Sequence, residues 1–163
     1  MTRQEVMAAL AARVSEQPRI RVAALIVIEG RVVLVRHRFG SSVYHLLPGG
    51  GVDYRETLED ALIREVREET GLDVGLGPLL FVSDTIDPHG PRHVVNLTFS
   101  ATVVGGHVTD SPHDNRVEAV DLMTPASLST LDLRPPMAEA IQRYVASGTV
   151  ESGYLGSLFS EGR

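Results

Sequence analysis

The hydrophobic positions along the chain predict a series of strands. Residues 20–28 are almost continuously apolar, as in a strand that is covered on both faces. Glu29 and Gly30 favour a tight turn, so residues 31–38 read as the return strand of a hairpin. Residues 94–104 alternate apolar and polar side chains, which is typical of a strand with one buried face. Shorter strands are predicted at residues 79–85 and 117–122, and loops at residues 39–44 and 75–78.

Other segments show the period of a helix. Residues 4–16 read as a modest helix, and residues 58–70 as a central helix of nearly four turns. Thr57 is expected to cap the start of the central helix and Gly71 to follow its end. Two further helical segments are predicted at residues 125–128 and 135–146. This order of elements predicts an α/β (α+β) fold in which a mixed sheet is sandwiched between helices.

The segment after the last predicted helix, residues 147–163, is rich in Ser and Gly. It either docks on the domain, docks on a second copy of the chain or stays disordered. Docking on a second copy would make a homodimer. The apolar side chains available for docking are Tyr154, Leu155, Leu158 and Phe159.

The central helix carries acidic side chains on its apolar face. At 100° per residue, Glu65 and Glu69 fall inside the apolar stripe, and Glu68 lies at its edge. Carboxylates on a buried face are costly unless a positive charge lies against them, and a hard divalent cation such as Mg²⁺ prefers such oxygens. The i, i+3, i+4 spacing lets all three converge on one metal cluster. The alternative is a solvated acidic helix held by ion pairs. The stripe itself consists of Leu58, Ala61, Leu62 and Val66.

Composition narrows the classes of protein. The chain has 163 residues, 43% of them apolar, which suits one globular domain. It has no Cys, which excludes disulfides, thiolate metal sites and cysteine catalysis. The net charge is −6 without a basic cluster, which argues against nucleic acid as the partner. We find no apolar run of about 18 residues and no signal peptide, so we expect a cytoplasmic protein without a membrane partner.

Residues 50–72 resemble the Nudix box, Gly-x5-Glu-x7-Arg-Glu-U-x-Glu-Glu-x-Gly-U, in which U is a bulky aliphatic residue. Every defined position matches, and the resemblance extends over about residues 20–146. It implies the Nudix fold and divides the chain into an N-terminal helix, a Nudix hydrolase domain and a tail. These three parts are residues 1–19, 20–146 and 147–163. The matching positions are Gly50, Glu56, Arg64, Glu65, Val66, Glu68, Glu69, Gly71 and Leu72.

The resemblance implies Mg²⁺-dependent hydrolysis within the diphosphate of a nucleoside diphosphate linked to another moiety, with Mn²⁺ as a substitute cofactor. Arg64 matches an orienting partner of a box carboxylate, and Glu56 matches a residue that holds the geometry of loop and helix, together with Gly50 and Gly71. The implied metal ligands are Glu65, Glu68, Glu69 and the backbone carbonyl of Gly49.

The general base stays open among Glu65, Glu68 and Glu118. Glu118 is the first candidate for the additional acid that the family often takes from a downstream segment, and Asp114 is the second. Arg116 stands where the family often has Glu, which is a departure from its pattern.

Substrate contacts are predicted outside the box. Arg36 and Arg38 end a predicted strand and suit phosphate, although exposed arginines at a sheet edge are the alternative. His45 stands where many Nudix proteins have Trp, and we assign it and His37 to substrate contact rather than to metal.

The substrate class stays open among ADP-ribose or a nucleotide sugar, an (oxidised) nucleoside triphosphate, and a dinucleoside polyphosphate. Pro88 lies 16 residues past the box, a spacing that members acting on ADP-ribose often share. A second class of function is a nucleotide-sensing module that binds without hydrolysis. Such modules usually lose box carboxylates, and this chain keeps all of them.

Overall fold

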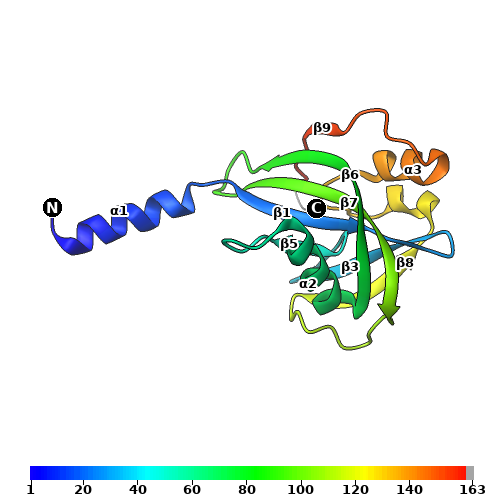
Figure 1. Ribbon diagram of the computed structural model, residues 1–163. Coiled ribbons are helices and arrows are strands. Elements are labelled where there is room, and N and C mark those ends of the chain that lie inside the picture. The colour runs from blue at the N-terminus through cyan, green and yellow to red at the C-terminus, as the bar shows by residue number, and fades with distance from the viewer. Residues whose placement is uncertain (161–163) are drawn as a thin grey trace.

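The computed structural model describes residues 1–160, except for the side chains of residues 13–15 (Figure 1). The prediction for residues 161–163 of the tail lies outside the described residues. The helices are α1 (Arg3–Ser15), α2 (Leu58–Thr70), α3 (Ala138–Ser147) and the 3₁₀ helix η1 (Pro125–Thr130). The strands are β1 (Arg19–Leu25), β2 (Val27–Ile28), β3 (Arg31–Phe39), β4 (Ser42–Leu46), β5 (Gly49–Gly51), β6 (Leu72–Ile86), β7 (His93–Gly106), β8 (Val117–Met123) and β9 (Tyr154–Ser157).

The strands form two sheets. The five-stranded sheet has the order β5-β1-β7-β6-β9. It is mixed, because β1 pairs parallel with β7 and antiparallel with β5, while β6 pairs antiparallel with β7 and parallel with β9. The second sheet is built on β3, which pairs antiparallel with β2, β4 and β8. The predicted α+β class with a mixed sheet is confirmed.

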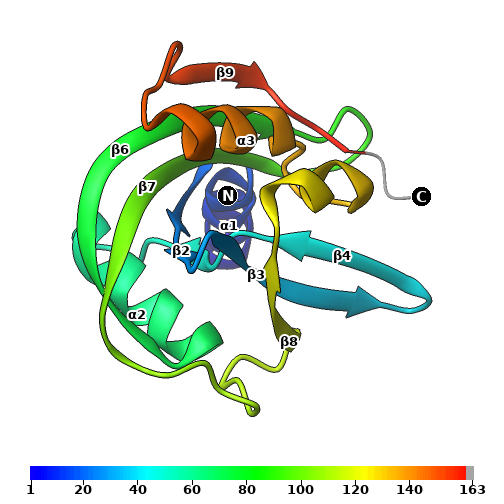
Figure 2. The same ribbon diagram turned by 90° about the vertical axis from the view of Figure 1, so that its right-hand side faces the viewer.

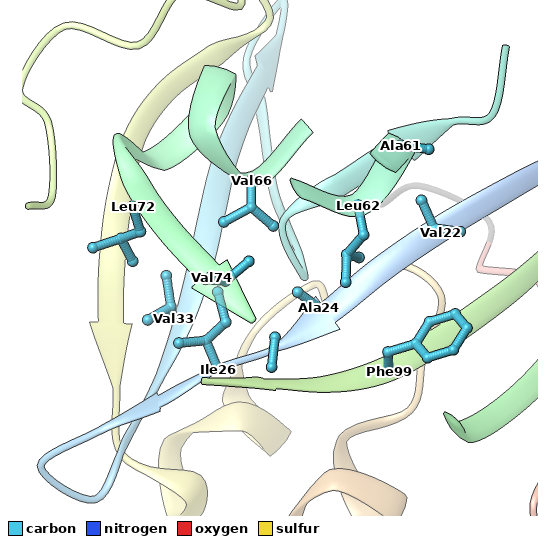
Figure 3. Close-up of a cluster of buried hydrophobic side chains, with 11 residues drawn as sticks. Val22, Ala24, Ile26, Val33, Ala61, Leu62, Val66, Leu72, Val74 and Phe99 are labelled. Carbon is cyan, nitrogen blue, oxygen red and sulfur yellow. The ribbon is translucent and has the colours of Figure 1, made fainter. Parts of the chain in front are cut away.

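Strand β1 lies between two apolar cores, as its continuous apolar sequence predicts. Val22, Ala24 and Ile26 belong to the core that contains the buried face of α2 (Figure 3). Ala23 and Leu25 belong to the other core, which includes residues of η1 and α3. Successive side chains of a strand point to opposite faces, so one strand contributes to both cores. The members of the two helical layers are Ala61, Leu62 and Val66 on one side and Leu128 and Ile141 on the other.

The predicted hairpin between residues 20–28 and residues 31–38 is wrong for most of its length. Only Val27 and Ile28 pair with the start of β3, whereas β1 pairs with β5 and β7 in the other sheet. The chain changes sheets at Ile26, whose carbonyl still accepts a hydrogen bond from the backbone N–H of Val33 at 3.0 Å. The apolar run does not reveal this change, because residues 22–26 are buried without a break on both sides of the point where the sheets meet.

Two segments predicted as loops take part in sheets. Residues 42–46 form β4, which pairs with the end of β3 and buries His45 and Leu46. Residues 75–78 lie within the long strand β6, at the point where its register with β7 shifts between Leu76 and Leu79. The glycines and polar residues of these two segments favoured loops in the sequence-based prediction. The strands still form, because strand pairing is made by backbone hydrogen bonds and does not require an apolar pattern.

The docked alternative for the tail is confirmed for its described part. Strand β9 lies alongside β6 on the same side of the molecule as α3 (Figure 2). The backbone N–H of Val82 donates to the carbonyl of Gly153 at 2.7 Å, and that of Leu158 donates to the carbonyl of Asp84 at 2.7 Å. Tyr154 adds a hydrogen bond from its hydroxyl to the Asp84 carboxylate.

Helix α1 extends away from the rest of the molecule (Figure 1). Its Val6 and Leu10 side chains are exposed, so the predicted helix forms without an apolar face packed on the domain. Across the described residues, every helix is too short or too polar to cross a membrane.

Candidate active site

Helix α2 has defined ends, which fixes the direction of its side chains. Thr57 Oγ1 accepts a hydrogen bond from the backbone N–H of Asp60 at 3.0 Å. Gly71, at φ 79°, donates its backbone N–H to the carbonyl of Arg67 at 3.0 Å. A positive φ favours glycine at this position. Both predicted caps are confirmed, and the buried face of the helix carries Glu65 and Glu69.

Three carboxylates from two segments meet at this face. Glu65 and Glu69 are 7% and 2% exposed, and Asp114 reaches them from the loop between β7 and β8. One carboxylate oxygen of each lies within 4.8 Å of the others. The loop is fastened to the end of α2, where Thr70 and Glu68 accept backbone hydrogen bonds from it. The site therefore combines the Nudix-box helix with the candidate that the sequence ranked second, Asp114.

The environment of Glu69 suits a bound cation. Burial raises the pKa of Glu69 to about 7. The N–H of Gly49 and the charge of Arg21 oppose this shift, and the charges of Glu65 and Asp114 add to it. Gly49 donates that N–H to Glu69 Oε2 at 2.9 Å. A hard divalent cation would offset the repulsion between these carboxylates, and their oxygens match the preference of Mg²⁺ or Mn²⁺. The residues present thus fit the cofactor implied by the box.

Gly50 makes room for one of these carboxylates. A Cβ built on Gly50 would lie 2.2 Å from Cδ of Glu65, well inside van der Waals contact. Any larger residue at this position would displace the Glu65 side chain. The requirement for glycine here comes from this close approach.

Arg64 orients two box glutamates at once. Its Nε and Nη2 donate to the two oxygens of Glu56 at 2.7 and 2.9 Å, and its Nη1 donates to Glu65 Oε1 at 2.8 Å. Hydrogen bonding to Arg64 lowers the pKa of Glu56 to about 2, with a further contribution from the backbone N–H of Asp53. Glu56 therefore stays ionised and fixes the guanidinium that holds Glu65.

We expect Arg64→Lys to lower kcat by roughly 10–100-fold, the usual cost of losing a residue that supports a metal ligand. Lys keeps the charge but lacks the planar fork that bonds Glu56 and Glu65 together. Steady-state kinetics at saturating Mg²⁺ would measure the loss. The matched control is Arg67→Lys on the same helix, where the side chain is 72% exposed and lies 3.4 Å from the Asp73 carboxylate. An Arg64→Lys enzyme as active as the Arg67→Lys enzyme would contradict the orienting role.

Other predicted site residues lie outside the carboxylate cluster. Glu68 is exposed, and its Oε2 lies 3.7 Å from Nη1 of Arg64. Glu118 is exposed on β8, where Arg38 Nε lies at 2.7 Å and Arg36 Nε at 3.2 Å from its carboxylate. Metal binding by Glu68 and by the carbonyl of Gly49, and a catalytic role of Glu118, stay predictions.

His45 is buried beside Asp121, with 2.8 Å between His45 Nε2 and Asp121 Oδ2. Carboxylates of β8 thus pair with three predicted substrate residues, Arg36, Arg38 and His45. None of the three lines the cavity of about 560 Å³ beside the carboxylate cluster. Their contact with substrate stays a prediction. His37 does line that cavity, and its buried Nε2 has no hydrogen-bond partner in the described part of the chain.

A cavity of about 560 Å³ opens beside the carboxylate cluster. Glu69 and residues 49–51 line one part of it, and Tyr44 lines another. The guanidinium of Arg134 lies 4.1 Å from the centre of the Tyr44 ring. The cavity therefore joins acidic, aromatic and strongly basic walls. Its arginines are Arg19, Arg21, Arg92, Arg116 and Arg134.

Sequence reasoning missed these arginines as a group. They come from β1 and from three loops, so no spacing along the chain relates them. The absence of Lys was a weak signal, because it leaves Arg as the only cation for phosphate. Arg116 also binds the cluster itself, donating from Nη2 to Asp114 Oδ2 at 2.6 Å, and this hydrogen bond holds the pKa of Asp114 below its usual value.

Comparison with known proteins gives consistent matches. The NUDIX domain model matches residues 17–144. An ADP-ribose pyrophosphatase of Methanocaldococcus jannaschii is 31% identical over 106 residues, which cover 64% of this chain and 63% of that protein. A MutT NUDIX hydrolase of Burkholderia pseudomallei is 32% identical with a TM-score of 0.61, over 82% of this chain and 99% of that one. A NUDIX hydrolase of Nitrosomonas europaea is 22% identical with a TM-score of 0.71, over 81% and 90% of the two chains.

Proposed function

The chain belongs to the Nudix family, and on this premise we propose that it is a Mg²⁺-dependent pyrophosphohydrolase acting on a nucleoside diphosphate linked to another moiety. The observation that carries the proposal is the cluster of Glu65, Glu69 and Asp114 at the edge of an arginine-lined cavity. A diphosphate can interact with both features of the site. Its oxygens suit the guanidinium groups, and a bound cation can bridge it to the carboxylates.

Each part of the site has a role in this reaction. Glu65, Glu69 and Asp114 would hold a divalent cation, which when bound neutralises the diphosphate and activates a water for attack on phosphorus. Arg21 and Arg116 lie in the same cavity as Glu69 and would bind phosphate oxygens through N–H groups other than those bonded to Leu47 and Asp114.

The proton of the attacking water needs an acceptor. Hydrogen bonding to Arg38 lowers the pKa of Glu118, which weakens it as a base. We therefore favour Glu65 or Glu68 for this role. Glu68 is exposed to solvent, so a proton taken up there can leave directly.

For the substrate we propose ADP-ribose. The chain is similar to an ADP-ribose pyrophosphatase of Methanocaldococcus jannaschii, although it spans only 63% of that protein's length. The position of Pro88 agrees with the same choice. A nucleoside triphosphate is the second candidate, favoured by the similarity to the MutT NUDIX hydrolase of Burkholderia pseudomallei.

A substrate panel tests the proposal. It would contain ADP-ribose, UDP-glucose, ordinary and oxidised nucleoside triphosphates, and diadenosine tetraphosphate, each with Mg²⁺ and with products separated by chromatography. We expect cleavage of ADP-ribose into AMP and ribose 5-phosphate with the highest kcat/KM of the panel. If a nucleoside triphosphate is preferred, the proposed substrate would be wrong, but the proposed type of reaction would stand. If no compound of the panel is cleaved, the result would contradict the hydrolase assignment and favour the nucleotide-sensing module.

A further inference from the structure

A second, smaller cavity adjoins the first. Its volume is about 230 Å³, and it shares Arg21, Leu46, Arg92 and Arg134 with the larger cavity. Glu69 and residues 49–51 do not line it, so it lies away from the carboxylate cluster. Pockets that hold a whole small ligand usually measure about 300–1,000 Å³. The volume of the second cavity therefore suits one part of a ligand whose remainder lies in the larger cavity.

The C-terminal tail builds one wall of this second cavity. Residues 158–160 line it, and each of them is half-buried. The tail is held there by the pairing of β9 with β6, and the hydrogen bond from the N–H of Leu158 to the carbonyl of Asp84 fixes the point where the wall begins. The wall is therefore an ordered part of the domain.

The remaining walls carry hydrogen-bonding groups. Asp87 accepts the backbone N–H of His89 on Oδ1 at 2.9 Å, while its Oδ2 has no hydrogen-bond partner among residues 1–160. Asn96 donates its amide to Thr85 Oγ1 at 2.9 Å, which leaves the Thr85 hydroxyl proton available to a ligand. The second cavity thus offers a carboxylate and hydroxyl groups among its lining residues.

Leu158 and Phe159 supply apolar lining to the same cavity. A carboxylate oxygen that accepts hydrogen bonds from hydroxyls, together with apolar lining for the carbon side of a ring, matches the chemistry of a sugar. A nucleobase would favour a slot between two flat groups, and Phe159 is the only aromatic residue among the described lining residues. Arg21, Arg92 and Arg134 line both cavities, so they are available to the phosphate that joins the sugar to the rest of the substrate.

We infer that this second cavity binds the phosphorylated pentose at the far end of the substrate, and that residues 158–160 of the tail contribute to that specificity. The inference rests on the proposed function, since it places the diphosphate in the first cavity. It gives the docked tail a role, because residues 158–160 form part of the cavity lining.

The test uses ribose 5-phosphate as a probe, measured by calorimetry with the full chain, and KM for ADP-ribose measured in parallel. We expect Phe159→Ala and Asp87→Asn each to weaken ribose 5-phosphate binding and raise KM by about tenfold, the range of a lost apolar or hydrogen-bonded contact. Orthophosphate binding should not change. The control is Phe39→Ala, because Phe39 is 81% exposed and lines neither cavity.

The outcomes separate the two proposals. Unchanged affinity for ribose 5-phosphate in both variants, with wild-type melting temperatures, would overturn the sugar assignment even if the enzyme hydrolyses ADP-ribose. Weakened binding of AMP instead would place the nucleoside in the second cavity, and would also overturn it. If ADP-ribose is not hydrolysed, the proposed substrate is wrong, while the binding of ribose 5-phosphate still decides the assignment of the second cavity.

Discussion

Replacing Glu69 with Gln is expected to lower kcat/KM by about a thousandfold or more, because it removes a charge from the metal cluster. Glu69 is 2% exposed, and one of its carboxylate oxygens lies within 4.8 Å of one from Glu65 and one from Asp114, so the substitution acts inside the cluster. Initial rates at saturating Mg²⁺ would measure the loss. The matched control is Glu59→Gln, an exposed position on the same helix that should keep the wild-type rate.

The fold of the Glu69→Gln variant should survive, since Gln keeps an oxygen that accepts the N–H of Gly49. In EDTA its stability should exceed that of the wild type above pH 7. The pKa of Glu69 is about 7 in the folded chain against an ordinary 4.5, so the folded state binds more protons between these values. Wild-type stability is then lost as pH rises through this window, whereas the variant has no such loss.

A Glu69→Gln variant with activity within tenfold of wild type would refute Glu69 as a metal ligand.

The second large effect is expected at Asp114. Asp114→Asn should lower kcat/KM by roughly a hundredfold and raise the Mg²⁺ concentration needed for half-maximal activity, because it removes the charge that the β7–β8 loop brings to the cluster. Asn can still accept the backbone N–H of Arg116, which donates to Asp114 Oδ1 at 2.9 Å. A magnesium titration of activity would measure both changes.

Glu118→Gln serves as the comparison for Asp114→Asn. Glu118 is exposed and bound by Arg38 and Arg36, so its loss should change kcat by less than about threefold, as for most exposed ion pairs. A larger loss at Glu118 than at Asp114, with Mg²⁺ affinity unchanged, would restore Glu118 as the general base. The preference for Asp114 over Glu118, which rests on the structure, would then be wrong.

The helical part of the site could be predicted from sequence because its information is local. The apolar stripe of α2 fixes the direction of Glu65 and Glu69, and the caps at Thr57 and Gly71 fix its ends. The same spacing brings Glu68 only to the edge of the stripe, where the side chain is exposed.

The rest of the site depends on contacts between distant segments. Asp114 reaches the cluster because the backbone of its loop bonds to the end of α2, and no side-chain pattern reports such bonds. The cavity arginines come from β1 and three loops whose positions follow from sheet order. The order of the strands could not be predicted either. The chain passes from one sheet to the other at Ile26 within a continuous apolar segment, and the sequence does not mark that point.

Cation dependence tests the central claim most directly. The best substrate of the panel would be incubated with wild-type protein in Mg²⁺, after removal of Mg²⁺ with EDTA, and after Mg²⁺ is restored. If Glu65, Glu69 and Asp114 hold a catalytic cation, hydrolysis stops in EDTA and returns with Mg²⁺. Hydrolysis that continues unchanged in EDTA would contradict the assignment of this cluster as the catalytic metal site.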